Sequence, residues 1–252
     1  KNNKVMTVEE LKEDIKKYVS PKTKAFILNS PSNPSGVVYS PKELEELAKY
    51  FSSQEIWVIS DEIYEKILYG NTTHVSIGSF SGMKEKTIVI NGFSKSHSMT
   101  GWRLGYAAGP KQAITYAKRL QGHANSGAAT FLQYAAVEGL KDCSFLKAMQ
   151  EEFKKRKEII VKGLNNIKGI VCPDPDGAFY VFPDISALFG KVLAGKKIEN
   201  SMDFSEVLLE GSHVAVVPGK AFGMDKNIRL SFATSVAEIN EGLSRIKKLV
   251  EG

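Results

Sequence analysis

The sequence lacks most of the features that mark specialised classes of protein. Its two cysteines, Cys143 and Cys172, cannot form a disulfide framework and have no Cys-x-x-Cys spacing, which predicts reduced thiols and a cytoplasmic location. No apolar run approaches the roughly 20 residues that a membrane helix needs, so we expect no membrane partner. The four histidines are scattered without the spacing of metal ligands, and we expect no metal.

Sequence motifs for nucleotides and nucleic acids are also missing. No two glycines are spaced as Gly-x-Gly, which excludes the dinucleotide fingerprint, and the stretch 190–197 fails as a P-loop because Lys197 stands where Ser or Thr must bind Mg²⁺. The net charge of +6 is spread over segments in which lysine alternates with acidic residues, as on solvated helix faces. We therefore expect no nucleic-acid partner.

What the sequence does contain is a regular alternation of short apolar runs and helix signals. Apolar runs at 25–28, 56–59 and 88–90 begin about 31 residues apart, the length of a βαβ unit. A helix is predicted from Pro41 with Ser40 as its cap, and another over 62–68 capped by Ser60 or Asp61. This predicts an α/β fold with a mostly parallel sheet and helices on both faces.

The second half of the sequence has a different texture. A run at 104–109 follows too closely for a parallel crossover, so we expect an antiparallel strand there. Helices are predicted over 111–122, 130–140 and about 145–165, followed by strands in 170–182, 214–219 and 228–233 and a final helix over 236–250. We predict a large domain over residues 1–145, and a long connecting helix with a smaller C-terminal α+β domain over 146–252.

Polar residues gather just after the predicted parallel strands, where open α/β sheets bind ligands. They are an amide, a carboxylate, a phenol, an amine and a guanidinium: Asn33, Asp61, Tyr64, Lys95 and Arg103. Each has an ordinary alternative, such as a turn residue for Asn33, a helix cap for Asp61 or a structural arginine for Arg103. Their convergence on one sheet edge is what points to function.

The combination of side chains suits pyridoxal 5′-phosphate (PLP). A lysine amine can form a Schiff base with a carbonyl cofactor, and a nearby cation such as Arg103 favours the neutral amine. Arg103 can also clamp a phosphate with its forked guanidinium. Asp61 can keep a pyridine nitrogen protonated, and Asn33 and Tyr64 can bind the phenolic oxygen of the ring.

Four segments carry a resemblance to a known family: NSPSNPSG (29–36), SDEIY (60–64), NGFSKSHSMTGWRLGY (91–106) and NIRLSFATS (227–235). They resemble the fold-type I, class I/II PLP-dependent aminotransferases, and most closely the bacterial-type aspartate aminotransferases. The resemblance implies that Lys95 is the Schiff-base lysine, that Asp61 partners the pyridine nitrogen, and that Arg103 binds the phosphate. It also implies that Tyr64 and Asn33 bind the phenolic oxygen.

The same resemblance implies that Arg229 binds the substrate α-carboxylate and that Asn33 also belongs to the substrate-binding residues. Alternation in the strand 228–233 supports this, because Ile228, Leu230 and Phe232 share one face and leave Arg229 on the other. A solvated strand arginine is the ordinary alternative.

The implied activity is transfer of an amino group from an amino acid, aspartate above all, to a 2-oxo acid such as 2-oxoglutarate in a cytoplasmic homodimer. Other PLP-dependent aminotransferases or lyases, for example on aromatic amino acids, stay open, as does a truncated non-catalytic fragment.

The sequence also departs from the family pattern. Members of the family begin well upstream of Lys1, and the portion before it carries a phosphate-binding loop and an aromatic residue that stacks on the cofactor ring. We therefore expect this chain alone to bind PLP weakly and to expose apolar surface. Gly92 stands where many relatives have a hydroxyl, and His97 replaces an aromatic residue.

Overall fold

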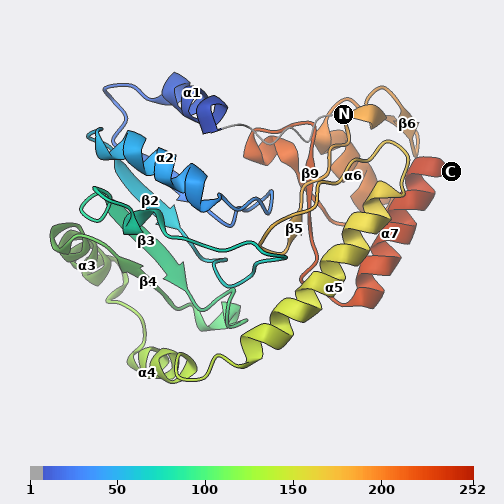
Figure 1. Ribbon diagram of the computed structural model, residues 1–252. Helices are drawn as coiled ribbons and strands as arrows, with labels where there is room; N and C mark the ends of the chain where they lie inside the picture. Colours follow the sequence, from blue (N-terminus) through green and yellow to red (C-terminus); the bar gives the residue numbers. More distant parts are fainter. Residues whose placement is uncertain (1–7) are drawn as a thin grey trace. The chain divides into compact units, whose positions relative to one another are not determined.

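A computed structural model describes residues 8–252; residues 1–7, with which the first predicted domain begins, lie outside the described residues. The chain divides into two compact units (Figure 1). The first runs to Pro31 and continues over Val38–Leu146, and the second combines Ser32–Val37 with Lys147–Gly252. A short segment that follows the first strand of the sheet therefore groups with the C-terminal residues.

A four-stranded sheet organises the first unit. Its strands are β1 (Ala25–Asn29), β2 (Trp57–Asp61), β3 (Thr87–Gly92) and β4 (Gly105–Ala108), in that spatial order. The first three are parallel, with Ala25 opposite Trp57 and Val58 opposite Thr87, and β4 is antiparallel to β3. The predicted strands and the antiparallel direction of the fourth are confirmed.

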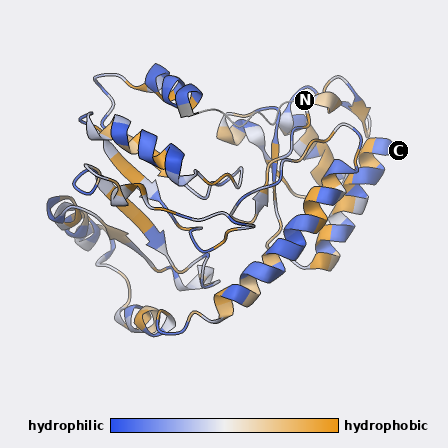
Figure 2. Ribbon diagram, in the orientation of Figure 1, coloured by the Kyte–Doolittle hydropathy of each residue, from blue (hydrophilic) through white to orange (hydrophobic). Residues whose placement is uncertain are grey.

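Helix α2 (Pro41–Ser52) covers one face of this sheet (Figure 1). It begins as predicted, because the Ser40 hydroxyl accepts the amide of Glu43 while the Glu43 carboxylate accepts the amide of Ser40. Its apolar stripe is buried in a core with β1, β2 and the turn Ile77–Ser79; the central members are Leu28, Leu44, Leu47, Phe51, Val58 and Ile77. Figure 2 shows the polar side of α2 turned outward.

The opposite face of β1 and β2 is open to solvent. Ile27 is 68% exposed and Trp57 40% exposed. Because side chains alternate along a strand, Asp61 lies on this same open face, four residues after Trp57, while Ser60 lies on the covered face. Ile27 and Trp57 thus form exposed apolar surface on this face of the sheet, as expected from the sequence.

The predicted helix over 62–68 does not form. After β2 the chain makes turns closed by bonds over three residues, from the Glu65 amide to the Glu62 carbonyl and from the Ile67 amide to the Tyr64 carbonyl. The side chain of Asp61 accepts the amide of Ile63, and Glu62 turns its carboxylate inward to partners far along the chain. These bonds compete with the helical pattern, so the cap signal was misleading.

The other helices of the first unit are α1 (Val8–Tyr18), α3 (Lys111–Asn125) and α4 (Thr130–Gly139). The last two confirm the helices predicted over 111–122 and 130–140. No helix within residues 8–252 has both the length and the apolar character needed to cross a bilayer.

The second unit contains α5 (Phe145–Asn165), whose first two residues belong to the first unit, together with α6 (Ser201–Ser212) and α7 (Val236–Glu251). Strand β9 (Ile228–Ser231) pairs antiparallel with β5 (Tyr180–Val181) and β8 (Val217–Pro218), and β6 (Val192–Leu193) pairs with β7 (Lys196–Lys197). The predicted α5, α7 and the three strands are confirmed, whereas α6 and the β6–β7 hairpin were not predicted.

Candidate active site

Lys95 follows β3 in a tight loop whose backbone folds back on itself. The amides of His97 and Met99 both donate to the carbonyl of Phe93, at 3.1 and 3.3 Å. The Lys95 ammonium nitrogen lies over the ring of Tyr64, 5.7 Å from its centroid. Tyr64 is only 4% exposed, so its ring gives the lysine side chain a fixed wall. The structure thus brings together two of the residues singled out by the sequence.

Asp61 is the last residue of β2, at the edge where Lys95 follows the neighbouring strand β3. Its carbonyl accepts the amide of Ser30 and the side-chain amide of Asn29, both at 3.2 Å. Its Oδ1 atom accepts the amide of Ile63 at 3.2 Å, which orients the carboxylate relative to the turn that carries Tyr64. Asp61, Tyr64 and Lys95 therefore share one edge of one sheet.

Arg103 lies in the loop before β4. Its backbone adopts the left-handed region with φ at 53°, directly after the 3-10 turn Thr100–Trp102. One guanidinium nitrogen donates to the carbonyl of Thr100 at 2.8 Å, and the residue is exposed. The local bond fixes the stem of this cation while the rest of the guanidinium remains accessible to an anion.

Gly92 explains one departure from the family pattern. It ends β3 opposite Gly105 of β4, and a Cβ atom added to it would lie 2.8 Å from the Cα of Gly105 and 2.9 Å from the carbonyl of Leu104. Both contacts are with backbone, which cannot move aside as a side chain can. A hydroxyl-bearing residue does not fit at this position of this sheet.

Arg229 and Asn33 meet in the second unit. One guanidinium nitrogen of Arg229 donates to the side-chain oxygen of Asn33 at 2.8 Å. The guanidinium lies over two rings, 4.7 Å from the centroid of Tyr180 and 5.3 Å from that of Phe222. Ile228 and Phe232 are fully buried on the other face of the strand, as the alternation predicts. The contact of Arg229 with these two rings was not predicted from the sequence.

The segment that carries Asn33 is held tightly against the second unit. The carbonyl of Gly36 accepts the amides of Asp176 and Gly177 at 3.0 and 2.8 Å. Gly36 has φ at +71°, and a Cβ atom there would lie 2.4 Å from Pro175. Only glycine permits this approach. The predicted site residues thus fall into two groups: Asp61, Tyr64, Lys95 and Arg103 in the first unit, Asn33 and Arg229 in the second.

A buried polar cluster next to Asp61 was missed from the sequence. Glu62 is 4% exposed, and its carboxylate accepts hydrogen bonds from the hydroxyls of Ser60 and Ser76, at 2.8 and 2.6 Å, and from Nε2 of His74 at 2.9 Å. Burial raises the pKa of Glu62, but the bonds from His74, Ser76 and Ser60 together outweigh it and hold the pKa below its usual value. No local pattern links His74 to Glu62, which precedes it by twelve residues.

The same cluster bears on metal binding. Among the described residues, one group of side chains, Glu62, Glu65 and His74, offers ligand atoms within 4.8 Å of one another. The oxygens of Glu62, however, are already taken by the three hydrogen-bond donors. A metal would have to displace these bonds, and the geometry favours a hydrogen-bonded carboxylate.

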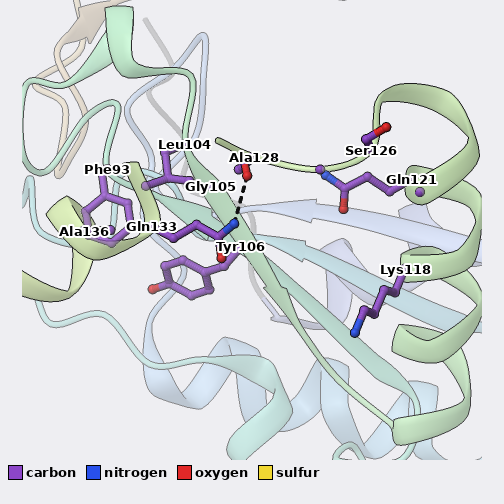
Figure 3. A pocket seen from close by; sticks show the side chains of 12 residues that line it. Phe93, Leu104, Gly105, Tyr106, Lys118, Gln121, Ser126, Ala128, Gln133 and Ala136 are labelled. Carbon is purple, nitrogen blue, oxygen red and sulfur yellow. Dashed lines mark hydrogen bonds between the residues drawn. The ribbon is translucent and has the colours of Figure 1, made fainter. Parts of the chain in front are cut away.

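A separate cavity of about 480 Å³ lies between β4, α3 and α4 (Figure 3). Phe93, Leu104, Tyr106 and Gln133 line it on one side, and Lys118 and Gln121 line it on the other (Figure 3). The side-chain amide of Gln133 donates to the carbonyl of Ala128 at 2.8 Å. None of the residues singled out by the sequence lines this cavity, and its lining contains no carboxylate. The candidate site residues therefore lie at the strand ends and outside this cavity.

Comparison with known proteins places the chain in context. The model of a family described as aminotransferase class I and II matches residues 1–246. A probable aspartate/prephenate aminotransferase of Rhizobium leguminosarum bv. phaseoli is 44% identical over 239 residues, which are 93% of this chain and 60% of that protein. The aspartate aminotransferase of Bacillus subtilis strain 168 is 43% identical over 241 residues, 95% of this chain and 60% of that protein. The chain thus spans about 60% of the length of these curated relatives.

Solved structures agree with the sequence matches. The aspartate aminotransferase of Rhizobium meliloti superposes with a TM-score of 0.89 at 40% identity, covering 98% of this chain and 62% of its own. An aromatic aminotransferase from Pyrococcus horikoshii OT3 gives 0.88 at 40% identity, covering 98% and 64%.

Proposed function

Because the chain belongs to the class I and II aminotransferases, we propose that its residues form part of a PLP-dependent active site. The reaction transfers an amino group from an amino acid, aspartate by preference, to a 2-oxo acid such as 2-oxoglutarate. The observation that carries the proposal is the amine of Lys95 over the ring of Tyr64, on the sheet edge that also bears Asp61.

The donor set of the first unit fits PLP. A primary amine, a carboxylate, a phenol and a guanidinium are the groups that an aldehyde, a pyridine nitrogen, a phenolic oxygen and a phosphate require. When bound, PLP supplies an aldehyde that takes up the amino group and a ring that accepts the electron pair released at the substrate Cα. Lys95 would hold the aldehyde, Asp61 the ring nitrogen, Tyr64 the phenolic oxygen, and Arg103 the phosphate. The family resemblance also assigns the phenolic oxygen to Asn33, which belongs to the second unit.

Lys95 and Tyr64 would also handle protons. The Lys95 amine would be the base that removes the proton from the substrate Cα. The buried ring of Tyr64 would limit the positions open to this amine, and the turn 61–65 would orient its phenol as a hydrogen-bond donor. The carboxylate of Asp61 would keep the ring nitrogen protonated.

Arg229 would bind the α-carboxylate of the substrate. A guanidinium supported by two aromatic faces and by the Asn33 oxygen is pre-oriented for a bidentate contact with a carboxylate. Asn33 would contribute to substrate binding through Arg229, since its side-chain oxygen accepts from the guanidinium.

A second candidate shares the cofactor but changes the side chain of the substrate. Relatives named for aspartate and prephenate, and a solved structure titled as an aromatic aminotransferase, match the chain about as well as those named for aspartate alone. A panel of aspartate, glutamate, phenylalanine and tyrosine as donors, with 2-oxoglutarate and prephenate as acceptors, decides between them. Resemblance to the family also favours a cytoplasmic location and a homodimer. Sedimentation equilibrium tests whether the chain forms the dimer.

The decisive experiment uses borohydride. The 252-residue chain is mixed with PLP, the absorbance of the yellow adduct is recorded, and reduction fixes the cofactor for peptide mass mapping. We expect the label on Lys95, its loss in Lys95→Ala, and its retention in Lys84→Ala, which removes an exposed lysine of the same unit. Label spread over surface lysines, or equal label in Lys95→Ala, would overturn the proposal.

A further inference from the structure

The buried cluster around Glu62 shares its backbone with Asp61. The carboxylate of Glu62 and the ring of His74 are 5% and 10% exposed, and their contact spans 2.9 Å. The hydroxyls of Ser60 and Ser76 complete the carboxylate's hydrogen bonds. Three donors from three places in the chain thus converge on one side chain directly after Asp61.

Alternation along the strand sends the two neighbouring carboxylates to opposite faces. Ser60 is buried on the covered face and Glu62 continues that side, whereas Asp61 lies on the open face. The peptide that joins them is held on both sides, because the Glu62 amide donates to Ile90 at 2.9 Å and the Asp61 carbonyl accepts from Ser30 at 3.2 Å. The hydrogen bonds of the Glu62 side chain therefore add a restraint to the same peptide that carries Asp61.

The cluster holds Glu62 as an anion. An ionised carboxylate can only accept, so the proton in the contact with His74 lies on Nε2. The other ring nitrogen, Nδ1, is buried and has no hydrogen-bond partner among the described residues. The imidazole is therefore committed to Glu62 alone, and the low pKa of Glu62 agrees with this assignment.

We infer that Glu62 and His74 are positioning residues for Asp61: their buried contact orients the Asp61 carboxylate toward the pyridine nitrogen of the cofactor. The inference rests on the proposed function. Groups that hold a functional ligand in orientation contribute to binding although they never touch it. Here Glu62 is the residue that directly follows Asp61, so a single peptide bond joins the positioning residue to the carboxylate it positions.

The test compares two ligands on three proteins. The ligands are PLP and its carbocyclic analogue, in which a C–H group replaces the ring nitrogen and leaves Asp61 without a partner. The proteins are the wild-type chain, Glu62→Gln, and Glu65→Gln as a matched control, because Glu65 is a neighbouring carboxylate outside the hydrogen bonds of the cluster. Dissociation constants come from absorbance titration of the adduct.

We expect Glu62→Gln to weaken PLP roughly 10-fold or more and the analogue less than about twofold, because the analogue cannot use Asp61. Glu65→Gln changes neither by more than about twofold. Equal weakening of both ligands by Glu62→Gln means a general structural role, and no weakening of PLP means no role; either overturns the inference. If the wild type binds neither ligand, the proposed function fails, and the inference fails with it.

A second readout needs no cofactor. The Ile63 amide donates to Oδ1 of Asp61, so its hydrogen exchange rate reports the orientation of that carboxylate directly. The variant Ser76→Ala removes one hydrogen-bond donor to Glu62 and leaves the charge of the Glu62 carboxylate in place. In the cofactor-free chain we expect this variant to speed hydrogen exchange at the Ile63 amide at least about threefold. The amide of Val58, inside the sheet, should be unchanged in the same sample. Unchanged exchange at Ile63 contradicts the inference even if Glu62→Gln fails to fold.

Discussion

The two units hold their proposed functional charges by different means. In the first, Asp61 is oriented through the backbone, and the adjacent carboxylate of Glu62 is buried under three hydrogen-bond donors. In the second, the guanidinium of Arg229 is half-buried and lies over Tyr180 and Phe222, with one hydrogen bond to Asn33.

The difference follows from the chemistry of the two ions. A carboxylate only accepts, so its burial requires directed donors, and losing one of them weakens the compensation of a buried charge. A guanidinium is planar and weakly hydrated, so aromatic faces can support it without saturating its donors. The first arrangement is strong and intolerant of change, and the second is weaker and leaves donors available for a ligand. The predictions below test that contrast.

The largest effect is expected from Glu62→Leu. The change leaves the buried ring of His74 and two hydroxyls without their acceptor, which should cost about 3–5 kcal/mol of unfolding free energy. Both tryptophans, Trp57 and Trp102, lie in the first unit, so urea unfolding followed by tryptophan fluorescence reports this unit. Glu65→Leu is the control and should stay within about 0.5 kcal/mol. A loss below about 1 kcal/mol for Glu62→Leu would remove the contrast between the units.

Much of the sheet was predictable because burial on a parallel sheet leaves continuous apolar runs. Strands β1, β2 and β3 follow such runs, and Ser40 with Pro41 marked the start of α2 through local capping chemistry. Helix α6 was missed although Phe204, Val207 and Leu208 are spaced as a helix face and Asn200 caps it. The sequence therefore carries a local signal for this helix, of the same kind as the one that marks α2.

The candidate site was predictable only in part. Lys95, Asp61 and Tyr64 stand out because they follow strand ends in a motif, and the geometry brings Lys95 onto Tyr64. The Glu62–His74 contact could not be predicted, since it is made by tertiary folding of a turn that local rules describe as a helix. The rings over Arg229 come from two other segments, and the sequence indicated only the face on which the arginine lies.

A smaller effect is expected from the aromatic support of Arg229. A double-mutant cycle of Phe222→Leu and Arg229→Gln should give a coupling energy of about 0.5–1 kcal/mol, the size of a partly exposed cation–π contact. Urea unfolding followed by far-UV circular dichroism measures it. The matched cycle of Phe222→Leu with Arg245→Gln should be additive, because Arg245 bonds Glu241 instead of a ring. Coupling above about 2 kcal/mol would mean that the second unit holds its charge as tightly as the first.

The smallest effect is a difference in pH dependence between the units. The folded-state pKa of Glu62 lies below its ordinary value of 4.5, so its ionised form stabilises the fold. This stability is fully present above pH 4.5 and is lost as the pH falls through the lower folded-state pKa. The difference in unfolding free energy between wild type and Glu62→Gln should therefore become smaller as the pH falls from 6 to 3. The same series on His74→Gln separates the contribution of the imidazole.

For the contribution of Arg229 to the unfolding free energy we expect no pH dependence, because a guanidinium stays charged throughout this range. The difference between wild type and Arg229→Gln should stay constant from pH 6 to pH 3 in the same urea series. A constant difference for Glu62→Gln as well would show that its carboxylate carries no proton-linked stability. The contrast between a buried anion held by donors and a cation held by rings would then rest on packing alone.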